Sequence, residues 1–273
     1  MNKLETHPYM TEEQWNNAIP KVVKSMTDYL KPFRVPVFED LGGHGKGWGS
    51  GSFIQLGDRV FILTNEHVAK VRLKNRKLIY QLLGREDLIE IKGNHCEQPY
   101  PIDLALLPID MNSWGETSNN SRAISLGQIS LAHTPVDNEI FTFTGFSGQN
   151  TRFLFNRLLC TATCYTAQEV ALPIDKRFNC RFHLGLDYNP NNATDVVGSD
   201  GLPMPPGLSG STLWNTGYVE AMNNGCQWQP EMATVTGVIW GWPSSNGHLL
   251  ATRSEYLSSF LLQALSKMER GEL

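Results

Sequence analysis

Residues 52–70 read SFIQLGDRVFILTNEHVAK, and this stretch decides the fold class. It holds two β-type runs, SFIQL and RVFILT, which are separated by turn residues. The second run is apolar from Val60 to Leu63, turns polar at Thr64, and delivers a single histidine, His67. A lone histidine beside an apolar strand is usually structural, so a functional role for His67 requires partners elsewhere in the chain.

The pattern of residues 52–64 repeats along the chain. The further short β-type runs are KLIYQLL, LIEIKG, DLALLPI, EIFTFTGF, RFLFNRLLCTATC, CRFHLGLDY, STLWN and TVTGVIW. Turn residues separate them, and the chain contains 24 glycines and 15 prolines. This spacing predicts an all-β sandwich or barrel rather than a βαβ sheet.

Two segments predict helices. Residues 11–30 begin with Thr11 and Gln14 in capping-box spacing, and Pro20 is expected to interrupt or kink that helix. Residues 254–270 begin with a serine cap and place an apolar stripe on one face, formed by Leu257, Phe260, Leu261, Ala264, Leu265 and Met268. Between the helices, LGGHGKGWGSGS (41–52) predicts a flexible loop, and it lacks the Lys-Ser/Thr ending of a phosphate-binding loop.

Composition narrows the classes of function. The 273 residues carry a formal net charge of −4 and no polybasic block, which favours neither nucleic acid nor membrane as a partner. No secretory signal is visible at the N-terminus, and no run approaches the roughly 18 apolar residues of a membrane span. The five cysteines are scattered, which does not indicate a disulfide framework. We therefore expect a cytoplasmic protein with free thiols.

Hydrolytic chemistry with His67 needs an orienting acid and a nucleophile. Asp103 precedes the apolar run Leu104–Leu107 and is the better acid, since Asp110 follows that strand and a proline. Ser209 lies in GLSGS, where Gly207 permits a turn whose N–H group converges with that of Ser209 on an oxyanion. The order His67, Asp103, Ser209 and the serine at position 211 both exclude the G-x-S-x-G elbow of α/β hydrolases.

With these residues assigned, the chain resembles the trypsin/chymotrypsin-like serine peptidases over roughly residues 48–266. TNEHVA is similar to their histidine motif, DLALL to their aspartate motif and GLSGS to their serine motif. VTGVIWGW (235–242) resembles the strand that lines their substrate cleft. The resemblance implies two six-stranded antiparallel β-barrels, an N-terminal helical extension over residues 1–45 and a peptidase domain over 46–273. The first barrel would span about 46–135, and the second, with the C-terminal helix, 136–273.

The resemblance also implies residue roles. His67 would be the general base and acid, Asp103 would fix its tautomer, Ser209 would attack, and the N–H groups of Gly207 and Ser209 would bind the oxyanion. Leu208 stands where zymogen-activated members carry Asp, so the chain is more similar to bacterial glutamyl endopeptidases and Deg-type proteases. The expected substrate-contacting residues are Pro203, Met204, Ile239, Trp240, Gly241 and Trp242. They favour a small or apolar P1 side chain, with Asp200 as a more distant pocket acid.

Two readings of function remain open from sequence. The first is a serine endopeptidase without a metal or cofactor, restrained by a regulatory protein partner or conformational change, with a bacterial stress or antiphage-defence system as one setting. The second is a catalytically silent protease-like module that binds peptides. A zinc site built from Cys160, Cys164, Cys180 and His183 is a weaker alternative, because its spacing lacks tight knuckles. His44, His95 and His183 are expected to be structural or surface residues.

Overall fold

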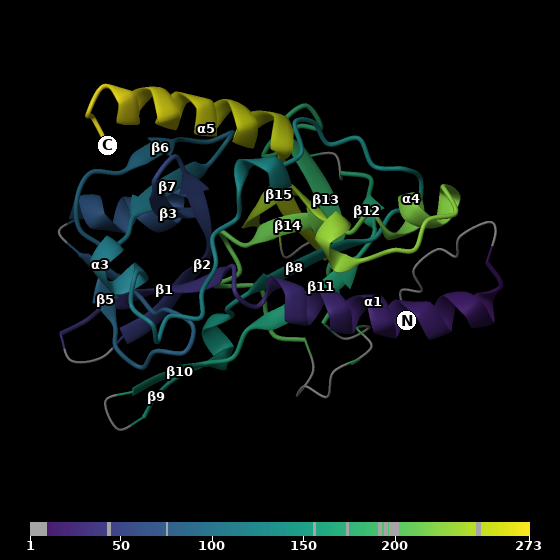
Figure 1. Ribbon diagram of the computed structural model, residues 1–273, viewed down its shortest axis with the longest axis horizontal. Helices are drawn as coiled ribbons and strands as arrows, with labels where there is room; N and C mark the ends of the chain where they lie inside the picture. Colours follow the sequence, from purple (N-terminus) through teal and green to yellow (C-terminus); the bar gives the residue numbers. More distant parts are fainter. Residues whose placement is uncertain are drawn as a thin grey trace.

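The computed structural model describes residues 10–42, 45–74, 76–154, 157–172, 175–190, 193, 196, 202–243 and 247–273. Two curled antiparallel sheets contain most of the strands, and two long helices pack against them (Figure 1). The prediction of an all-β fold built from two antiparallel sheets is confirmed. Each sheet has seven strands rather than the six expected. The excess comes from very short strands, which carry too little alternation to be predicted from sequence.

The first sheet is built from residues 34–108 in the order β5-β4-β1-β2-β3-β7-β6. Its strands are β1 Arg34–Asp40, β2 Gly45–Leu56, β3 Arg59–Thr64, β4 Lys77–Tyr80, β5 Ile89–Glu90, β6 Cys96–Gln98 and β7 Leu104–Pro108. Strand β1 pairs with both β2 and β4. Residues 34–40 are therefore an integral part of the first sheet, although the sequence placed them in the N-terminal extension.

The second sheet is built from residues 141–253 in the order β11-β8-β14-β15-β16-β13-β12. Its strands are β8 Phe141–Gly145, β11 Thr163–Ala167, β12 Glu169–Val170, β13 His183–Asp187, β14 Thr212–Asn215, β15 Thr234–Gly241 and β16 His248–Arg253. A separate two-stranded ribbon, β9 Thr151–Leu154 and β10 Arg157–Cys160, projects from the body in Figure 1.

The glycine-rich segment, predicted as a flexible loop, is largely strand: its residues from Gly45 onward belong to β2. The glycines serve close packing. A Cβ atom at Gly49 would lie 2.8 Å from a methyl group of Val68, and one at Gly51 would lie 2.5 Å from a methyl group of Ile62. Side chains at these positions would push β2 away from its neighbours, so glycine here reflects contact rather than flexibility.

Apolar side chains alternate between two cores along the central strands. On β3, Val60 and Ile62 pack inside the first sheet, whereas Phe61 and Leu63 face the core between the sheets. On β15, Val238 joins the core between the sheets and Ile239 the interior of the second sheet. Because both faces of these strands are buried, a one-residue slip would exchange the two cores, and the register is strongly fixed.

The helices pack against the core between the sheets or against the core of the first sheet. They are α1 Glu12–Leu30, α2 Glu66–Ala69, α3 Met111–Trp114, α4 Tyr218–Asn223 and α5 Ser254–Glu269, with 3₁₀ turns η1 Lys70–Lys74, η2 Leu126–Gln128, η3 Gly148–Asn150 and η4 Pro230–Met232. In Figure 1, α1 lies along the second sheet, and α5 crosses the opposite side of the molecule above the first. Both insert buried side chains into the shared core.

The two predicted long helices are confirmed, with differences in detail. The Thr11–Gln14 capping box forms in α1, and the helix runs through Pro20 without interruption. In α5 the predicted stripe packs on the core, but Ser254 is the first helical residue and Arg253 occupies the cap position. No helix in the described part of the chain is long and apolar enough to cross a membrane.

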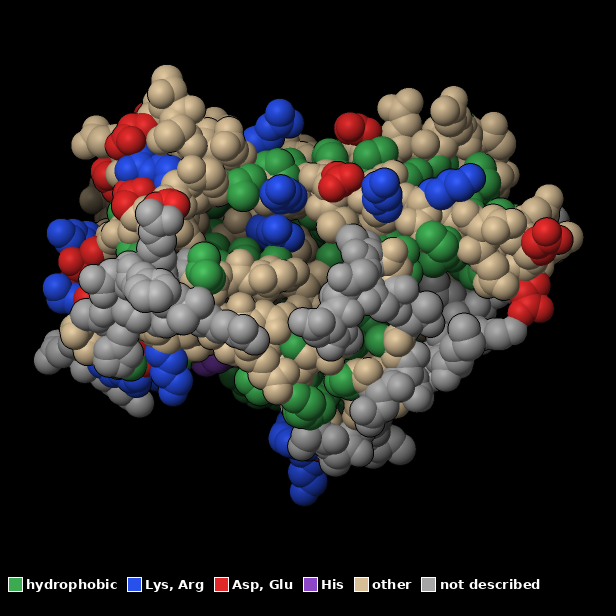
Figure 2. All heavy atoms as spheres, turned by 90° about the horizontal axis from the view of Figure 1, so that it is seen from below, with side chains coloured by type: hydrophobic (Ala, Val, Ile, Leu, Met, Phe, Trp, Pro, Cys, Tyr) green, Lys and Arg blue, Asp and Glu red, His purple; other side chains and the backbone are tan. Residues whose placement is uncertain are grey.

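Surface charge is mixed on the face that Figure 2 shows, which is the side of Figure 1 seen from below. In its described part, Lys and Arg side chains lie among Asp and Glu side chains and scattered hydrophobic ones. This distribution agrees with the small net charge of −4.

Candidate active site

His67 and Asp103 form a direct pair at the junction of β3 and β7. Strand β3 ends at Thr64, and the short helix α2 that follows presents His67. The Nδ1 atom of His67 lies 2.7 Å from Oδ2 of Asp103, and the backbone N–H of His67 donates to Oδ1 at 3.0 Å. A carboxylate only accepts hydrogen bonds, so Nδ1 carries the proton and Nε2 is left as an acceptor.

Burial differs sharply within this pair. The side chain of Asp103 is 7% exposed, whereas that of His67 is 46% exposed. The acid is thus shielded from water while the ring opens to solvent and to a ligand. Asp103 also adopts a left-handed backbone conformation, with φ of 51°, which aspartate tolerates better than most residues.

Asp110, the weaker acid candidate, serves a different purpose. Its carboxylate caps α3 by accepting from the backbone N–H groups of Asn112 and Ser113. The hydroxyl of Ser113 is the main cause that lowers the pKa of Asp110. Asp110 is therefore a helix cap and not a partner of His67.

The turn that carries Ser209 depends on two glycines with positive φ. Gly207 has φ of 103°, and a Cβ there would lie 2.6 Å from the carbonyl oxygen of Phe146. Gly210 has φ of 93°, and a Cβ there would lie 2.0 Å from the carbonyl oxygen of Ser50. Any side chain at either position would meet backbone atoms in a conformation that already disfavours it.

Two backbone N–H groups of this turn point away from internal acceptors. The Pro206 carbonyl accepts from Gly148 N, and the Leu208 carbonyl accepts from the N–H and hydroxyl of Ser211. Because a trans peptide sets its N–H opposite its carbonyl, the N–H groups of Gly207 and Ser209 are directed the other way. Within the described residues, neither N–H has an intramolecular acceptor. The turn therefore has its two candidate oxyanion donors available.

Ser50 of β2 connects this turn to both sheets. Its Oγ donates to the Gly207 carbonyl and accepts from Phe146 N, each at 2.8 Å. Its backbone N–H donates to the Ser209 carbonyl at 2.8 Å, and its own carbonyl accepts from the Thr64 hydroxyl at 2.7 Å. Ser50 thus fixes the turn at residues 207–210, which carries the candidate nucleophile Ser209 and is called the nucleophile turn below, against the strand that leads to His67.

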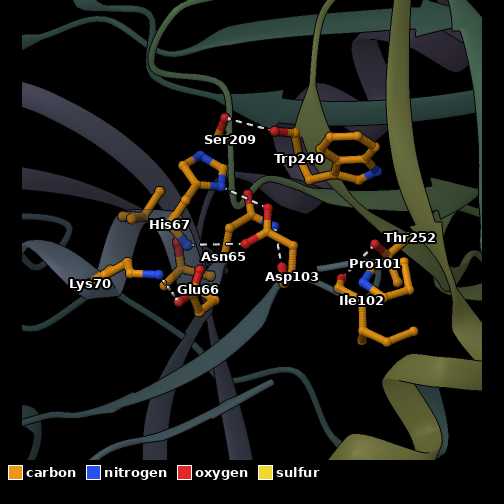
Figure 3. Close-up of polar contacts among 12 residues, drawn as sticks. Asn65, Glu66, His67, Lys70, Pro101, Ile102, Asp103, Ser209, Trp240 and Thr252 are labelled. Atoms are coloured by element: carbon orange, nitrogen blue, oxygen red, sulfur yellow. Dashed lines mark hydrogen bonds and ion pairs between the residues drawn. The ribbon is translucent and has the colours of Figure 1, made fainter. Parts of the chain in front are cut away.

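Ser209 lies on the side of the His67 ring away from Asp103 (Figure 3). Its hydroxyl donates to the carbonyl oxygen of Trp240 at 3.3 Å. This bond is long, so little free energy opposes a rotation of the hydroxyl. The three predicted residues are thus brought together, with the hydroxyl of Ser209 turned toward β15 and not bonded to His67.

The predicted substrate-contacting residues separate into two groups. Trp240, Gly241 and Trp242 are half-buried at the end of β15, and Met204 is exposed. Ile239 and Pro203 are buried, and the side chain of Ile239 packs inside the second sheet. Ile239 instead acts through its backbone, because its carbonyl accepts from Gly210 N at 2.8 Å. Asp200 and His44 lie outside the described residues.

A cavity of about 570 Å³ opens beside Gly207, between β2 and the nucleophile turn. It is lined by Leu41, Gly45, Lys46, Gly47, Trp48, Gly148, Thr151, Pro206 and Gly207. The indole N–H of Trp48 donates to the Val68 carbonyl, next to His67. The cavity therefore borders the candidate oxyanion turn at Gly207, and Trp48 in its wall bonds to the helix that carries the histidine.

The zinc alternative finds no support in the geometry. Among the described residues, no three His, Cys, Asp or Glu side chains form a cluster suited to a metal ion. His183 is instead buried, donates from Nε2 to the Pro101 carbonyl at 2.7 Å and accepts at Nδ1 from Asn179 N at 3.2 Å. Burial is the main cause that lowers the pKa of His183. His95 pairs with Glu97.

Sequence reasoning gave no role in the site to four residues that hold it together, namely Ser50, Asn65, His183 and Thr252, although it did expect His183 to be a structural or surface residue. Each bonds to a backbone group far away in the chain. Only Asn65 lay within a quoted motif, TNEHVA. Nothing in the local sequence of the other three distinguishes them from ordinary strand residues.

Comparisons with known proteins find structural similarity at low sequence identity and show no family for this chain. No protein-family model matches it, and no curated protein matches it. Among solved structures, the serine protease domain of the Sesbania mosaic virus polyprotein is similar, with 13% identity and a TM-score of 0.45 over 84% of this chain and 92% of that chain. A second structure concerns the coupled folding and binding of the disordered Sesbania mosaic virus VPg protein, driven by aromatic interactions. It has 13% identity and a TM-score of 0.46 over 84% of this chain and 90% of that chain. At this similarity, function has to be argued from the residues of the site.

Proposed function

We propose that the protein is a serine endopeptidase whose catalytic residues are His67, Asp103 and Ser209. The observation that carries the proposal is the hydrogen-bonded pair of His67 and Asp103, with Ser209 on the opposite side of the imidazole. A histidine that donates from Nδ1 to a shielded carboxylate keeps Nε2 free to take a proton from a hydroxyl. The available N–H groups of Gly207 and Ser209 add the donors that such chemistry needs.

In the proposed reaction, the hydroxyl of Ser209 turns from the Trp240 carbonyl toward His67. Oγ attacks the scissile carbonyl carbon while Nε2 takes the hydroxyl proton, and the N–H groups of Gly207 and Ser209 stabilise the oxyanion. The intermediate collapses as His67 gives that proton to the leaving amine, which forms the acyl-enzyme. Water, deprotonated by His67, then attacks the ester carbon, the bond from that carbon to Oγ breaks, and His67 returns the proton to Ser209 as the carboxylic product leaves.

Two regions beside Ser209 are proposed to take the two halves of a substrate. The acyl side would run along the end of β15, past Trp240, Gly241 and Trp242, with Met204 nearby. The leaving-group side would run over the cavity beside Gly207, past Lys46 and Trp48. We retain the preference for a small or apolar P1 side chain as a proposal.

Regulation is proposed to act without zymogen cleavage. Leu208 is buried in the apolar core of the second sheet, so the nucleophile turn is fixed by packing and needs no new ammonium group. The hydroxyl of Ser209 donates a hydrogen bond to the backbone carbonyl of Trp240. A protein partner or conformational change that turns it toward His67 would switch activity on. A relationship to bacterial glutamyl endopeptidases and Deg-type proteases, a cytoplasmic location and an antiphage-defence setting remain predictions.

One observation favours the alternative of a catalytically silent peptide-binding module. The Ser209 hydroxyl donates to the Trp240 carbonyl rather than to His67, so the nucleophile is not activated in this conformation. A cleft locked in this state would bind a peptide without cutting it.

Cleavage of a peptide library separates the two functions. We expect the wild type, alone or with a candidate partner, to yield products that are absent with Ser209→Ala and with His67→Ala. His95→Ala is the matched control, because it also removes a histidine paired to a carboxylate, at 3.0 Å from Glu97. Peptide binding by the wild type without Ser209-dependent products under any condition would favour the binding module.

A further inference from the structure

Three consecutive backbone carbonyls at the acid are each held by a side chain. His183 Nε2 donates to the Pro101 carbonyl at 2.7 Å, and the Thr252 hydroxyl donates to the Ile102 carbonyl at 2.7 Å. Asn65 Nδ2 donates to the carbonyl of Asp103 itself at 2.8 Å. We call His183, Thr252 and Asn65 the carbonyl clamp. Figure 3 shows the Thr252 and Asn65 contacts on either side of Asp103.

Two members of the carbonyl clamp belong to the second sheet. His183 begins β13, Thr252 lies on β16, and the two are directly paired across these strands. Asn65 comes from the first sheet, immediately after β3. Asp103 itself precedes β7 of the first sheet. The acid is therefore fixed from both sheets at once.

The members of the clamp are themselves fixed. All three are buried, so each lost bond would leave a backbone carbonyl without water to replace it. The N–H of Asn179 donates to Nδ1 of His183, which places the proton of that ring on Nε2, facing Pro101. The lowered pKa of His183 keeps the ring neutral, so this donor and acceptor pattern persists at neutral pH.

The segment needs such support because Asp103 has a left-handed backbone conformation, with φ of 51°. A residue with a side chain adopts this conformation only where its surroundings impose it. Both carboxylate oxygens of Asp103 then bond to His67. A shift of the segment would move both bonds together, and misplacement by about 1 Å is enough to cost about 100-fold in rate.

We propose that His183 and Thr252 are positioning residues, which transmit the docking of the second sheet to the carboxylate of Asp103 and so to the tautomer of His67. Neither touches a substrate, and their catalytic effect rests on the proposed function. The geometry makes formation of the acid–histidine pair conditional on contact between the two sheets.

The test compares Thr252→Val, which removes the hydroxyl at nearly constant volume, with Thr252→Ser, which retains it. Thr236→Val is the matched control. It removes another buried threonine hydroxyl of the second sheet, which bonds to His133 Nδ1 at 2.6 Å and to no carbonyl of the 101–103 segment. Thermal unfolding of each full-length variant verifies the fold, and His183→Gln, which retains a side-chain donor, provides a second probe of the clamp.

The first readout is the NMR resonance of the His67 Nδ1–H proton, which reports its bond to Asp103 and requires no catalysis. We expect this resonance to broaden or shift in Thr252→Val and to stay unchanged in Thr252→Ser and Thr236→Val. An unchanged resonance in Thr252→Val would overturn the inference, whether or not the protein proves to be a peptidase.

The second readout is the rate at which a fluorophosphonate probe labels Ser209. We expect Thr252→Val to slow labelling about 10-fold, the loss of about one hydrogen bond, and Thr252→Ser to restore it. Equal rates in Thr252→Val and Thr236→Val would overturn the inference. A wild type that is not labelled would contradict the proposed function and leave the NMR result to decide the clamp.

Discussion

The segment that carries Asp103 and the turn that carries Ser209 meet at one site but are held by different means. Side chains of the carbonyl clamp hold the acid, each through one hydrogen bond. The nucleophile turn is held mainly by backbone contacts and by Gly207 and Gly210, where even a Cβ would collide with backbone atoms. Substitutions in the carbonyl clamp should therefore weaken the position of Asp103 in graded steps. Substitution of a glycine in the nucleophile turn should disrupt that turn in a single step.

The largest effect is expected from Gly210→Ala. A left-handed conformation costs a residue with a Cβ about 1–2 kcal/mol, and overpacking against backbone adds about 1–3 kcal/mol. We expect urea unfolding to show a loss of about 2–5 kcal/mol and Ser209 to lose its reactivity. Gly57→Ala is the control, because Gly57 has φ of 61° with open space around it, and it should lose only the conformational part. If Gly210→Ala lost no more stability than Gly57→Ala and kept the reactivity of Ser209, the contrast between the nucleophile turn and the Asp103 segment would be wrong.

Asp103→Asn is expected to lower catalysis strongly while leaving the fold intact. The amide still accepts from the His67 backbone but presents N–H groups to Nδ1, which imposes the wrong tautomer. In a triad of this type the loss in kcat is about 10⁴-fold. Peptide cleavage measures it, with Asp110→Asn as a control that weakens a helix cap. Equal activity of the two variants would show that Asp103 is not the acid.

Ser50→Ala probes a side-chain hydroxyl that joins the nucleophile turn to β2. Its loss leaves the Gly207 carbonyl and the Phe146 N–H without their partner in a buried site, at a cost of about 1–3 kcal/mol. We expect labelling of Ser209 to slow by about 10- to 100-fold. Ser52→Ala, on the same strand, removes a buried hydroxyl that bonds to Thr212 and should leave labelling unchanged. Equal labelling rates for both variants would remove Ser50 from the account.

The smallest expected effect is on the pH dependence of stability, and it concerns His183 of the carbonyl clamp. Burial lowers the pKa of His183 in the folded protein below its unfolded value of about 6.5. Just below pH 6.5 the unfolded chain binds this proton more readily than the folded one, so stability falls as pH falls through that window. Above pH 6.5 the contribution is fully present. Thermal unfolding is measured from about one pH unit above to about one pH unit below that pKa. As pH falls over this range, the midpoint temperature of unfolding should decline more steeply for the wild type than for His183→Gln. Parallel declines would contradict this role of burial.

The sequence predicted the fold class and the candidate triad for clear physical reasons. Apolar runs such as RVFILT must bury themselves whatever the rest of the chain does, and the order His67, Asp103, Ser209 is a property of the chain itself. By contrast, the glycine-rich first half of β2 was missed, because its glycines indicate flexibility when read locally. Their purpose becomes visible only when Val68 and Ile62 are seen to pack against them.

The residues that support the site also could not be predicted, because their roles likewise depend on contacts with distant parts of the chain. Ser50 bonds to a carbonyl 157 positions away, and Thr252 to one 150 positions away. Such bonds depend on how the two sheets dock, which no local pattern encodes. Ile239 illustrates the converse: the cleft motif includes it, but the strand turns its side chain into the core and leaves only its backbone to serve the site.

The central claim is that Ser209 is a nucleophile activated by the His67–Asp103 pair. Intact-mass analysis after exposure to a fluorophosphonate probe, followed by mapping of the modified residue, tests it most directly. The account predicts a single adduct on Ser209 in the wild type, none in Ser209→Ala, and strongly slowed labelling in His67→Ala and Asp103→Asn. Labelling of Ser209→Ala at the wild-type rate, or labelling of Ser209 that is indifferent to His67, would contradict it.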